Sequence, residues 1–139
     1  MAETQNPLQI YLVEDSPLIQ HILVSAIKEA GAEVSGCATD ADTAISDVFV
    51  LQPDVILIDI RLAKGSGFDV LRALKDHNLA PGASKVVLTN YAYAEYQALA
   101  TRLGADRFFD KSLEMSQAVE LIHSLVAQRS GARREAVPH

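Results

Sequence analysis

Three acidic residues follow apolar runs of the chain. Asp59 comes directly after the run at residues 55–58, and Glu14 and Asp15 come directly after the run at residues 8–13. Carboxylates held close together repel one another, so either one of them takes a proton or a cation lies among them. Mg²⁺ suits such a cluster, because it prefers oxygen ligands and shares its remaining positions with water and phosphate oxygens. With the cation bound, Asp59 is placed to attack phosphorus and carry an acyl phosphate.

Two other polar residues follow later apolar runs. Thr89 comes after residues 85–88, and Lys111 comes just after residues 107–109. A lysine can pair with one oxygen of a phosphoryl group and a hydroxyl can bond another, which stabilises the charge of the group being moved. Each residue alone has an ordinary explanation, as a turn threonine or a solvated lysine. The full set at successive strand ends favours phosphoryl chemistry.

The elements that must position these residues are short strands alternating with helices. Stretches with apolar residues three and four apart predict helices, and the first of them has Ser16 as its cap, Pro17 in its opening turn and Gly31 as its stop. The strand runs are too continuously apolar for a half-exposed antiparallel sheet, so they indicate a parallel sheet with helices on both faces. This alternation predicts one doubly wound α/β domain with ligands at the carboxyl ends of its strands. The predicted strands are residues 8–13, 33–37, 55–58, 85–88 and 107–109.

Composition narrows the class of protein. The chain has 139 residues, 49% of them apolar, and we expect one domain at residues 8–128, with flexible tails at 1–7 and 129–139 and no output domain. No apolar stretch is long enough to cross a bilayer and the start lacks a secretory pattern, so we expect a cytoplasmic protein with no membrane contact. Cys37 is the single cysteine, which excludes an internal disulfide. The net charge of −6 argues against direct binding of nucleic acid.

Together these residues resemble the receiver domain of bacterial two-component response regulators, in the stand-alone form typified by the chemotaxis regulator. The resemblance covers about residues 8–128, with the functional positions at the right strand ends and in the right order. It implies a flavodoxin-like (βα)5 domain whose five parallel strands have the order 2-1-3-4-5. It also implies that Asp59 is the phosphoacceptor, Thr89 the switch hydroxyl and Lys111 the lysine that pairs with the phosphate.

The resemblance assigns a metal and a second switch residue as well. Phe108 looks like the switch aromatic, although packing in the core would explain it equally well from the sequence. The chain would catalyse its own phosphorylation and dephosphorylation at Asp59 without being a conventional enzyme. The Mg²⁺ ligands that the resemblance implies are Glu14, Asp15, Asp59 and the backbone carbonyl of Arg61.

Four positions depart from the family's pattern. Ser112 follows Lys111 where the family usually has proline, commonly with a cis peptide bond, so the turn is either rebuilt in trans or strained. Ala63 stands in the loop after the phosphoacceptor where proline is frequent. Arg61 and Tyr91 replace the smaller or acidic residues often found two positions beyond the phosphoacceptor and the switch hydroxyl. Our hypothesis is that these two side chains shield the acyl phosphate from water and so set its lifetime.

By the same resemblance, the partners would be a sensor histidine kinase or phosphotransfer protein as donor and an unknown downstream protein as target. The donor would face the start of the first helix, at Ser16 and Pro17. Thr89 would move toward the phosphoryl group, and the aromatic ring of Phe108 would fill the space it leaves. The face of the fourth helix, fifth strand and fifth helix would then change its binding of the target, and the chain would be a monomer or a weak phosphorylation-dependent dimer. Three tyrosines suited to an interface are expected on that face: Tyr91, Tyr93 and Tyr96.

Other functions stay open at this point. The chain could serve as a phosphate shuttle or sink in a phosphorelay, or be the receiver fragment of a longer regulator. A phosphatase with an aspartate nucleophile is a remote alternative, because such enzymes normally have a second acid two residues on, where this chain has Arg61. A nucleotide- or flavin-binding module of similar topology would need glycines or hydroxyls at the first strand end, where Glu14 and Asp15 repel phosphate.

Overall fold

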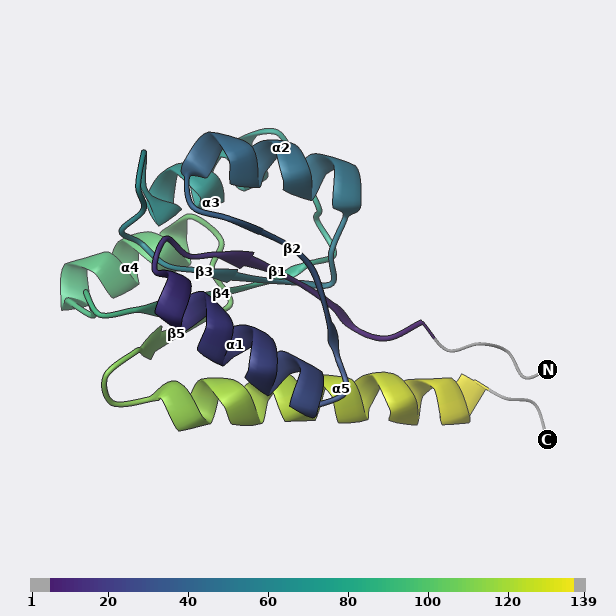
Figure 1. The fold of residues 1–139 in the computed structure, drawn as a ribbon. Helices are drawn as coiled ribbons and strands as arrows, with labels where there is room; N and C mark the ends of the chain where they lie inside the picture. Colours follow the sequence, from purple (N-terminus) through teal and green to yellow (C-terminus); the bar gives the residue numbers. More distant parts are fainter. Residues whose placement is uncertain (1–5, 137–139) are drawn as a thin grey trace.

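A five-stranded parallel sheet lies at the centre of the molecule (Figure 1). The structure is a computed structural model that describes residues 6–136, with side chains described for residues 6–130. Its strand order is β2-β1-β3-β4-β5, which confirms the predicted doubly wound fold. The elements in chain order are β1 (Gln9–Val13), α1 (Pro17–Glu29), β2 (Glu33–Ala38), α2 (Ala41–Leu51), β3 (Val55–Ile58), α3 (Gly67–Asp76), β4 (Ser84–Thr89), α4 (Ala94–Arg102), β5 (Arg107–Asp110) and α5 (Met115–Ala136).

Helices cover both faces of the sheet, as the apolar strands predict. α1 and α5 pack on one face, and α2, α3 and α4 pack on the other (Figure 1). Successive residues of β1 alternate between the two cores: Ile10 and Leu12 lie under α1 and α5, while Tyr11 and Val13 lie under the other three helices. All four side chains are essentially inaccessible to water. The sheet is therefore a rigid base whose strand ends hold their positions.

Helix α1 begins and ends where the sequence predicts. Ser16 is the N-cap of α1, and its side-chain oxygen accepts a hydrogen bond from the backbone N–H of Ile19 at 3.3 Å. Pro17 opens the helix, where its missing N–H is not needed. The helix ends before Gly31, which adopts a φ of +93° that favours glycine. These three sequence predictions are confirmed, and the acids between strand and helix are left in a turn of only three residues.

The register of the sheet brings the acids of β1 and β3 to the same level. Val13 pairs with Ile58 at the carboxyl ends of the two strands. The N–H of Asp59 donates to the carbonyl of Val13 at 2.9 Å, so the next residue of β3 is also tied to β1. Glu14 and Asp59 therefore lie side by side at the carboxyl edge, on strands that are far apart in the sequence but neighbours in the sheet.

Helix α5 is longer than the sequence indicates. It extends over 22 residues to Ala136, so the prediction of a flexible tail from residue 129 is wrong for residues 129–136. Arg129 helps to hold this part of the helix, because its guanidinium forms an ion pair with Asp54 at 3.0 Å and donates to the carbonyl of Asn6 at 3.0 Å. No helix within residues 6–136 is long and apolar enough to cross a membrane. The outer parts of both predicted tails, residues 1–5 and 137–139, lie outside the described residues.

Candidate functional site

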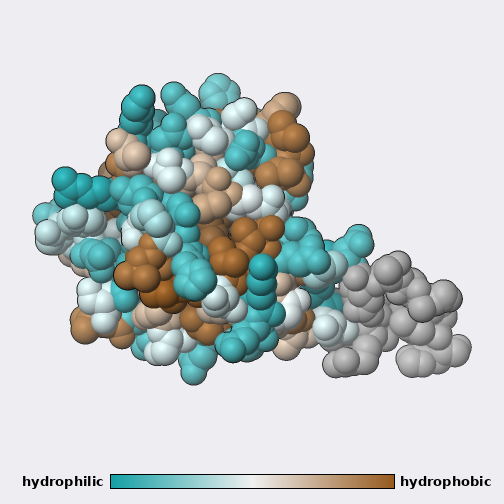
Figure 2. Space-filling view, in the orientation of Figure 1, coloured by the Kyte–Doolittle hydropathy of each residue, from teal (hydrophilic) through white to brown (hydrophobic). Residues whose placement is uncertain are grey.

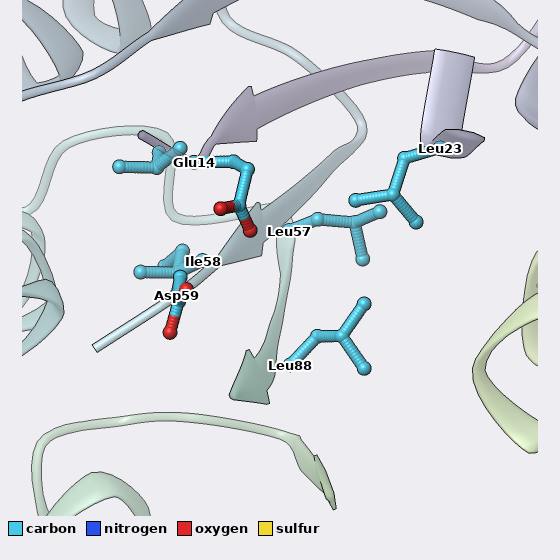
Figure 3. Close-up of a pocket in the computed structure, with 7 residues that line it drawn as sticks. Glu14, Leu23, Leu57, Ile58, Asp59 and Leu88 are labelled. Carbon is cyan, nitrogen blue, oxygen red and sulfur yellow. The ribbon is translucent and has the colours of Figure 1, made fainter. Parts of the chain in front are cut away.

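The three predicted acids meet at the carboxyl edge of the sheet. Glu14, Asp15 and Asp59 each offer one carboxylate oxygen, and these oxygens all lie within 4.8 Å of one another. Glu14 is 3% exposed and Asp59 6%, so both carboxylates are nearly removed from water. Figure 3 shows them at the ends of neighbouring strands, with leucines of α1, β3 and β4 close beside them. Clustered carboxylate oxygens are the donors that Mg²⁺ prefers, so these residues fit that cation.

Lys111 pairs with both buried acids. Its ammonium donates to Oε1 of Glu14 and to Oδ2 of Asp59, each at 2.8 Å, and the lysine itself is 8% exposed. Burial acts to lower the pKa of Lys111, but the bonds to both carboxylates outweigh it and the pKa is raised. Burial raises the pKa of Glu14 despite the opposing bonds from Lys111 and the Ser16 N–H. The predicted lysine thus lies at the centre of the acid cluster.

The backbone at Asp59 is held by the start of α3. The N–H of Gly67 donates to the carbonyl of Ile60 at 2.8 Å. A Cβ at Gly67 would lie 2.4 Å from the carbonyl oxygen of Asp59, so only glycine fits this close approach. A capping box between Ser66 and Asp69 fixes the same helix start. The sequence predictions missed Gly67 as a site residue, although the Gly-Ser-Gly run just before α3 was the available signal.

Thr89 lies beside the acids without facing them. Its side chain is fully buried at the end of β4, and its Oγ1 accepts a hydrogen bond from the N–H of Tyr91 at 3.2 Å. Its carbonyl accepts from the N–H of Lys111 at 2.8 Å, which ties the ends of β4 and β5 together. Phe108 is partly buried and packs against the core under α2, α3 and α4. A hydroxyl and an aromatic ring are therefore adjacent to the site, on the side where α4 packs.

An open cleft of about 310 Å³ lies above the acids. Arg61 and Tyr91 line its rim, and Asn90 and the three acids line it as well. The guanidinium of Arg61 donates to the hydroxyl of Tyr91 at 2.8 Å and lies 5.3 Å from the centre of the tyrosine ring. Arg61 and Tyr91, two of the residues that depart from the family's pattern, are thus paired at the mouth of the cleft. A pair in this position is what the hypothesis that these side chains shield an acyl phosphate from water requires.

The turn after Lys111 is rebuilt without a cis bond. The Lys111–Ser112 peptide is trans, as are the other peptide bonds of the described residues. The backbone N–H of Ser112 donates to the carboxylate of Asp110 at 2.8 Å, and its hydroxyl donates to the side-chain oxygen of Asn90 at 3.1 Å. Side-chain hydrogen bonds therefore fix the turn that proline usually fixes in the family.

The tyrosines lie on a different face from the one predicted. Tyr96 packs edge to face with Phe68 of α3, with ring centres 5.3 Å apart, and with Tyr93 at 5.2 Å. They therefore line the gap between α3 and α4. The prediction that they mark the surface of α4, β5 and α5 is wrong, because the start of α4 turns these side chains toward α3.

Comparison with known proteins identifies the family. Response regulator receiver domains match residues 10–123, and the chain belongs to this family. It is 26% identical over 117 residues to the chemotaxis protein CheY of Thermotoga maritima, which covers 84% of this chain and 96% of that protein. It is 25% identical over 127 residues to the transcriptional regulatory protein PdtaR of Mycobacterium tuberculosis, which covers 91% of this chain. The chain spans 60% of the length of PdtaR.

A solved structure supports the fold. The receiver domain of sensor histidine kinase PA1611 from Pseudomonas aeruginosa superposes with a TM-score of 0.75 at 20% identity, covering 87% of this chain and 98% of that one. That crystal structure has a magnesium ion coordinated in its active site cleft. The likeness establishes the CheY-like arrangement of five strands and five helices over the described residues.

Replacing Gly67 with alanine tests the close approach at Asp59. We expect Gly67→Ala to lower the free energy of unfolding by about 1–3 kcal/mol, because the new Cβ displaces the backbone that it meets. Gly82→Ala is the matched control, since a Cβ there meets nothing within 4 Å and the φ is not positive. Urea unfolding of the two variants measures the effect. Equal stability of the two variants would show that the backbone at Asp59 can shift to accept a side chain at Gly67 without cost.

Replacing Lys111 with methionine tests its role in the acid cluster. Without Mg²⁺ we expect Lys111→Met to lower the free energy of unfolding by about 3–5 kcal/mol, because two buried carboxylates lose the ammonium that pairs with them. Adding Mg²⁺ should raise the unfolding temperature of this variant more than that of the unchanged chain, since lysine no longer competes for the carboxylates. Lys28→Met, at an exposed position of α1, is the control. Equal gains from Mg²⁺ in all three proteins would contradict this competition.

Proposed function

We propose that Asp59 accepts a phosphoryl group from a sensor histidine kinase or a phosphotransfer protein in a reaction that needs Mg²⁺. The observation that supports this most directly is the buried Asp59 carboxylate, bonded to Lys111 within a cluster of three acids, in a chain of the receiver family. Mg²⁺ would be held by Glu14, Asp15, Asp59 and the backbone carbonyl of Arg61, and it would supply positive charge that lets an anionic donor approach.

Each residue of the site has a separate role in this reaction. A carboxylate oxygen of Asp59 attacks the phosphorus, the phosphorus–nitrogen bond of the donor histidine breaks, and the imidazole leaves with that electron pair. Lys111 releases Oδ2 of Asp59 and pairs with an oxygen of the transferred group. The Thr89 hydroxyl, which now accepts a bond from Tyr91, turns to donate to another oxygen. Its movement draws the start of the β4–α4 loop toward the site and frees space beside Phe108.

Exposed apolar side chains beside the cleft support docking of the donor at α1. Leu18 and Ile22 of α1 are 68% and 42% exposed, and Leu113, in the loop after β5, is 79% exposed. Figure 2 shows apolar side chains gathered on the face formed by α1. Large apolar side chains at a rim of polar residues favour binding of a partner helix. The donor histidine would then reach the cleft from the side where Ser16 and Pro17 begin α1.

The output follows from the surface that the switch residues touch. Phosphorylation would alter the packing of Phe108 and so the face formed by α4, β5 and α5, which would change the binding of a downstream protein in the cytoplasm. On that face the guanidinium of Arg107 lies 5.1 Å from the ring centre of Phe109. A role as phosphate shuttle or sink, or as the receiver part of a longer regulator, uses the same chemistry at Asp59.

Acetyl phosphate tests the phosphoacceptor directly. Incubation with acetyl phosphate and Mg²⁺ should add the mass of one phosphoryl group to the chain, because the small donor needs no docking surface. The gain should disappear in Asp59→Asn and when Mg²⁺ is chelated, and it should persist in Asp42→Asn, on the exposed side of α2. Mass spectrometry of the intact protein measures it. Continued hydrolysis of phosphomonoesters without a stable mass gain would instead support a phosphatase.

The lifetime of the acyl phosphate tests the pair at the mouth of the cleft. We expect Arg61→Asn and Tyr91→Ala each to speed dephosphorylation by about threefold or more, because water then reaches Asp59 past the lost contact. Tyr93→Ala is the control, since Tyr93 does not line the cleft. Decay of the phosphorylated mass after removal of donor gives the rate. Unchanged rates in both cleft variants would refute the shielding hypothesis.

A further inference from the structure

A second cavity lies next to the acid cleft, between the β3–α3 loop and the start of α4. It has a volume of about 470 Å³, within the range of cavities that hold ligands. Five of its lining residues, which we call the tyrosine groove, are Arg61, Phe68, Tyr91, Tyr93 and Tyr96.

The walls of the tyrosine groove are largely aromatic. Tyr96 is held edge to face between Phe68 and Tyr93, with ring centres 5.3 and 5.2 Å away. Yet Tyr93 remains 56% exposed and Tyr96 36% exposed, so the fold leaves much of this aromatic surface in water. Tyrosines held in place offer a partner large contact area at a low cost in side-chain entropy. Such side chains are enriched in protein interfaces.

The charge of the groove defines what fits it. Arg61 is the one described residue lining the groove that is charged at neutral pH, in a chain whose net charge is −6. Its guanidinium gives one N–H to the hydroxyl of Tyr91, and an arginine presents five N–H donors in a planar fork. A carboxylate can therefore bind the remaining donors in a bidentate pair while apolar groups contact the rings.

We propose that the tyrosine groove binds an acidic segment of a partner protein, with a carboxylate on Arg61 and an aromatic or large aliphatic side chain packed against the exposed surface of the tyrosine rings. The groove is open to the surface between the β3–α3 loop and the start of α4, and the guanidinium of Arg61 and the hydroxyl of Tyr91 lie beside its aromatic rings. That arrangement suits an extended chain in which acidic residues flank apolar ones. It is separate from the face of α4, β5 and α5.

Binding in the tyrosine groove would depend on whether Asp59 is phosphorylated. Arg61 and Tyr91 line both the acid cleft and the groove, so one side-chain pair contacts both ligands. A phosphoryl group on Asp59 adds negative charge at the cleft and attracts the guanidinium away from the groove. This coupling rests on the proposed phosphorylation of Asp59, whereas binding of the segment to the unmodified chain does not.

Two peptides test the binding. The probe is the blocked hexapeptide Asp-Glu-Trp-Leu-Asp-Glu, and its matched control is Asn-Gln-Trp-Leu-Asn-Gln. We expect the acidic peptide to bind the unmodified chain about tenfold more tightly, as one charge-assisted pair provides, and to shift the backbone resonances of residues 61–68 and 91–96 in NMR titration. Equal affinities, no binding at about 1 mM peptide, or shifts confined to α5 and β5 would overturn the proposal.

Three variants locate the site. Arg61→Gln should remove the preference for the acidic peptide over its amide form, and Tyr93→Ser should weaken both peptides about threefold or more by removing one wall. Phe49→Ser is the control, because Phe49 is an aromatic residue whose side chain is 62% exposed, close to the value for Tyr93. It lies near the end of α2, away from the groove. Figure 2 shows an apolar patch over that end of α2, at the upper right. Far-UV circular dichroism of all three variants should show an intact fold. An effect of Phe49→Ser equal to that of Tyr93→Ser would refute the assignment.

Phosphorylation provides the last test. The acidic peptide should bind the chain at least about threefold more weakly when mass spectrometry shows a full phosphoryl load on Asp59. Unchanged affinity at full load would overturn the coupling. A chain that binds the acidic peptide but gains no phosphoryl mass would overturn the proposed function and leave the groove as a binding site.

Discussion

The two bonds from the Lys111 ammonium to Glu14 and Asp59 are the interaction on which the site depends. They join residues 97 and 52 positions apart in the sequence, each 2.8 Å from the same nitrogen. Removing three charges from water is costly, and replacing such a group with apolar residues often stabilises a protein. The ion triad therefore adds little to stability that leucines could not provide. What it adds is an aspartate that is buried and oriented, with a cation that can shift to a new anionic group.

The surrounding structure serves to hold that triad at a fixed place. The register of β1 with β3 sets Glu14 beside Asp59, and the bond from the Lys111 N–H to Thr89 sets the lysine beside β4. At the back, α3 begins so close to Asp59 that Gly67 can carry no side chain. Every one of these contacts is made by backbone atoms of packed elements. The site is consequently rigid at its base, and movement is left to the loops that carry Thr89 and Arg61.

The sequence allows the base of the site to be predicted better than its rim. Strand identity follows from apolar runs and helix limits from caps such as Ser16, so the acids and Lys111 could be placed at one edge by topology alone. The rim depends on side-chain rotation, which periodicity does not report. Tyr96 thus faces α3, contrary to prediction, and the link between Ser112 and Asn90 was not foreseen. The end of α5 was missed because its last turns are not marked by an apolar stripe.

The pair formed by Arg61 and Tyr91 links two cavities that differ in chemistry. One holds acids and would take a cation with a phosphoryl group, while the other holds aromatic rings and would take an acidic chain. Coupling between two ligands through one shared element is reciprocal at equilibrium. If a phosphoryl group on Asp59 weakens the segment's hold on Arg61, a bound segment must disfavour the phosphorylated state by the same factor. A partner in the tyrosine groove would therefore act as an input to the site as well as a reader of it.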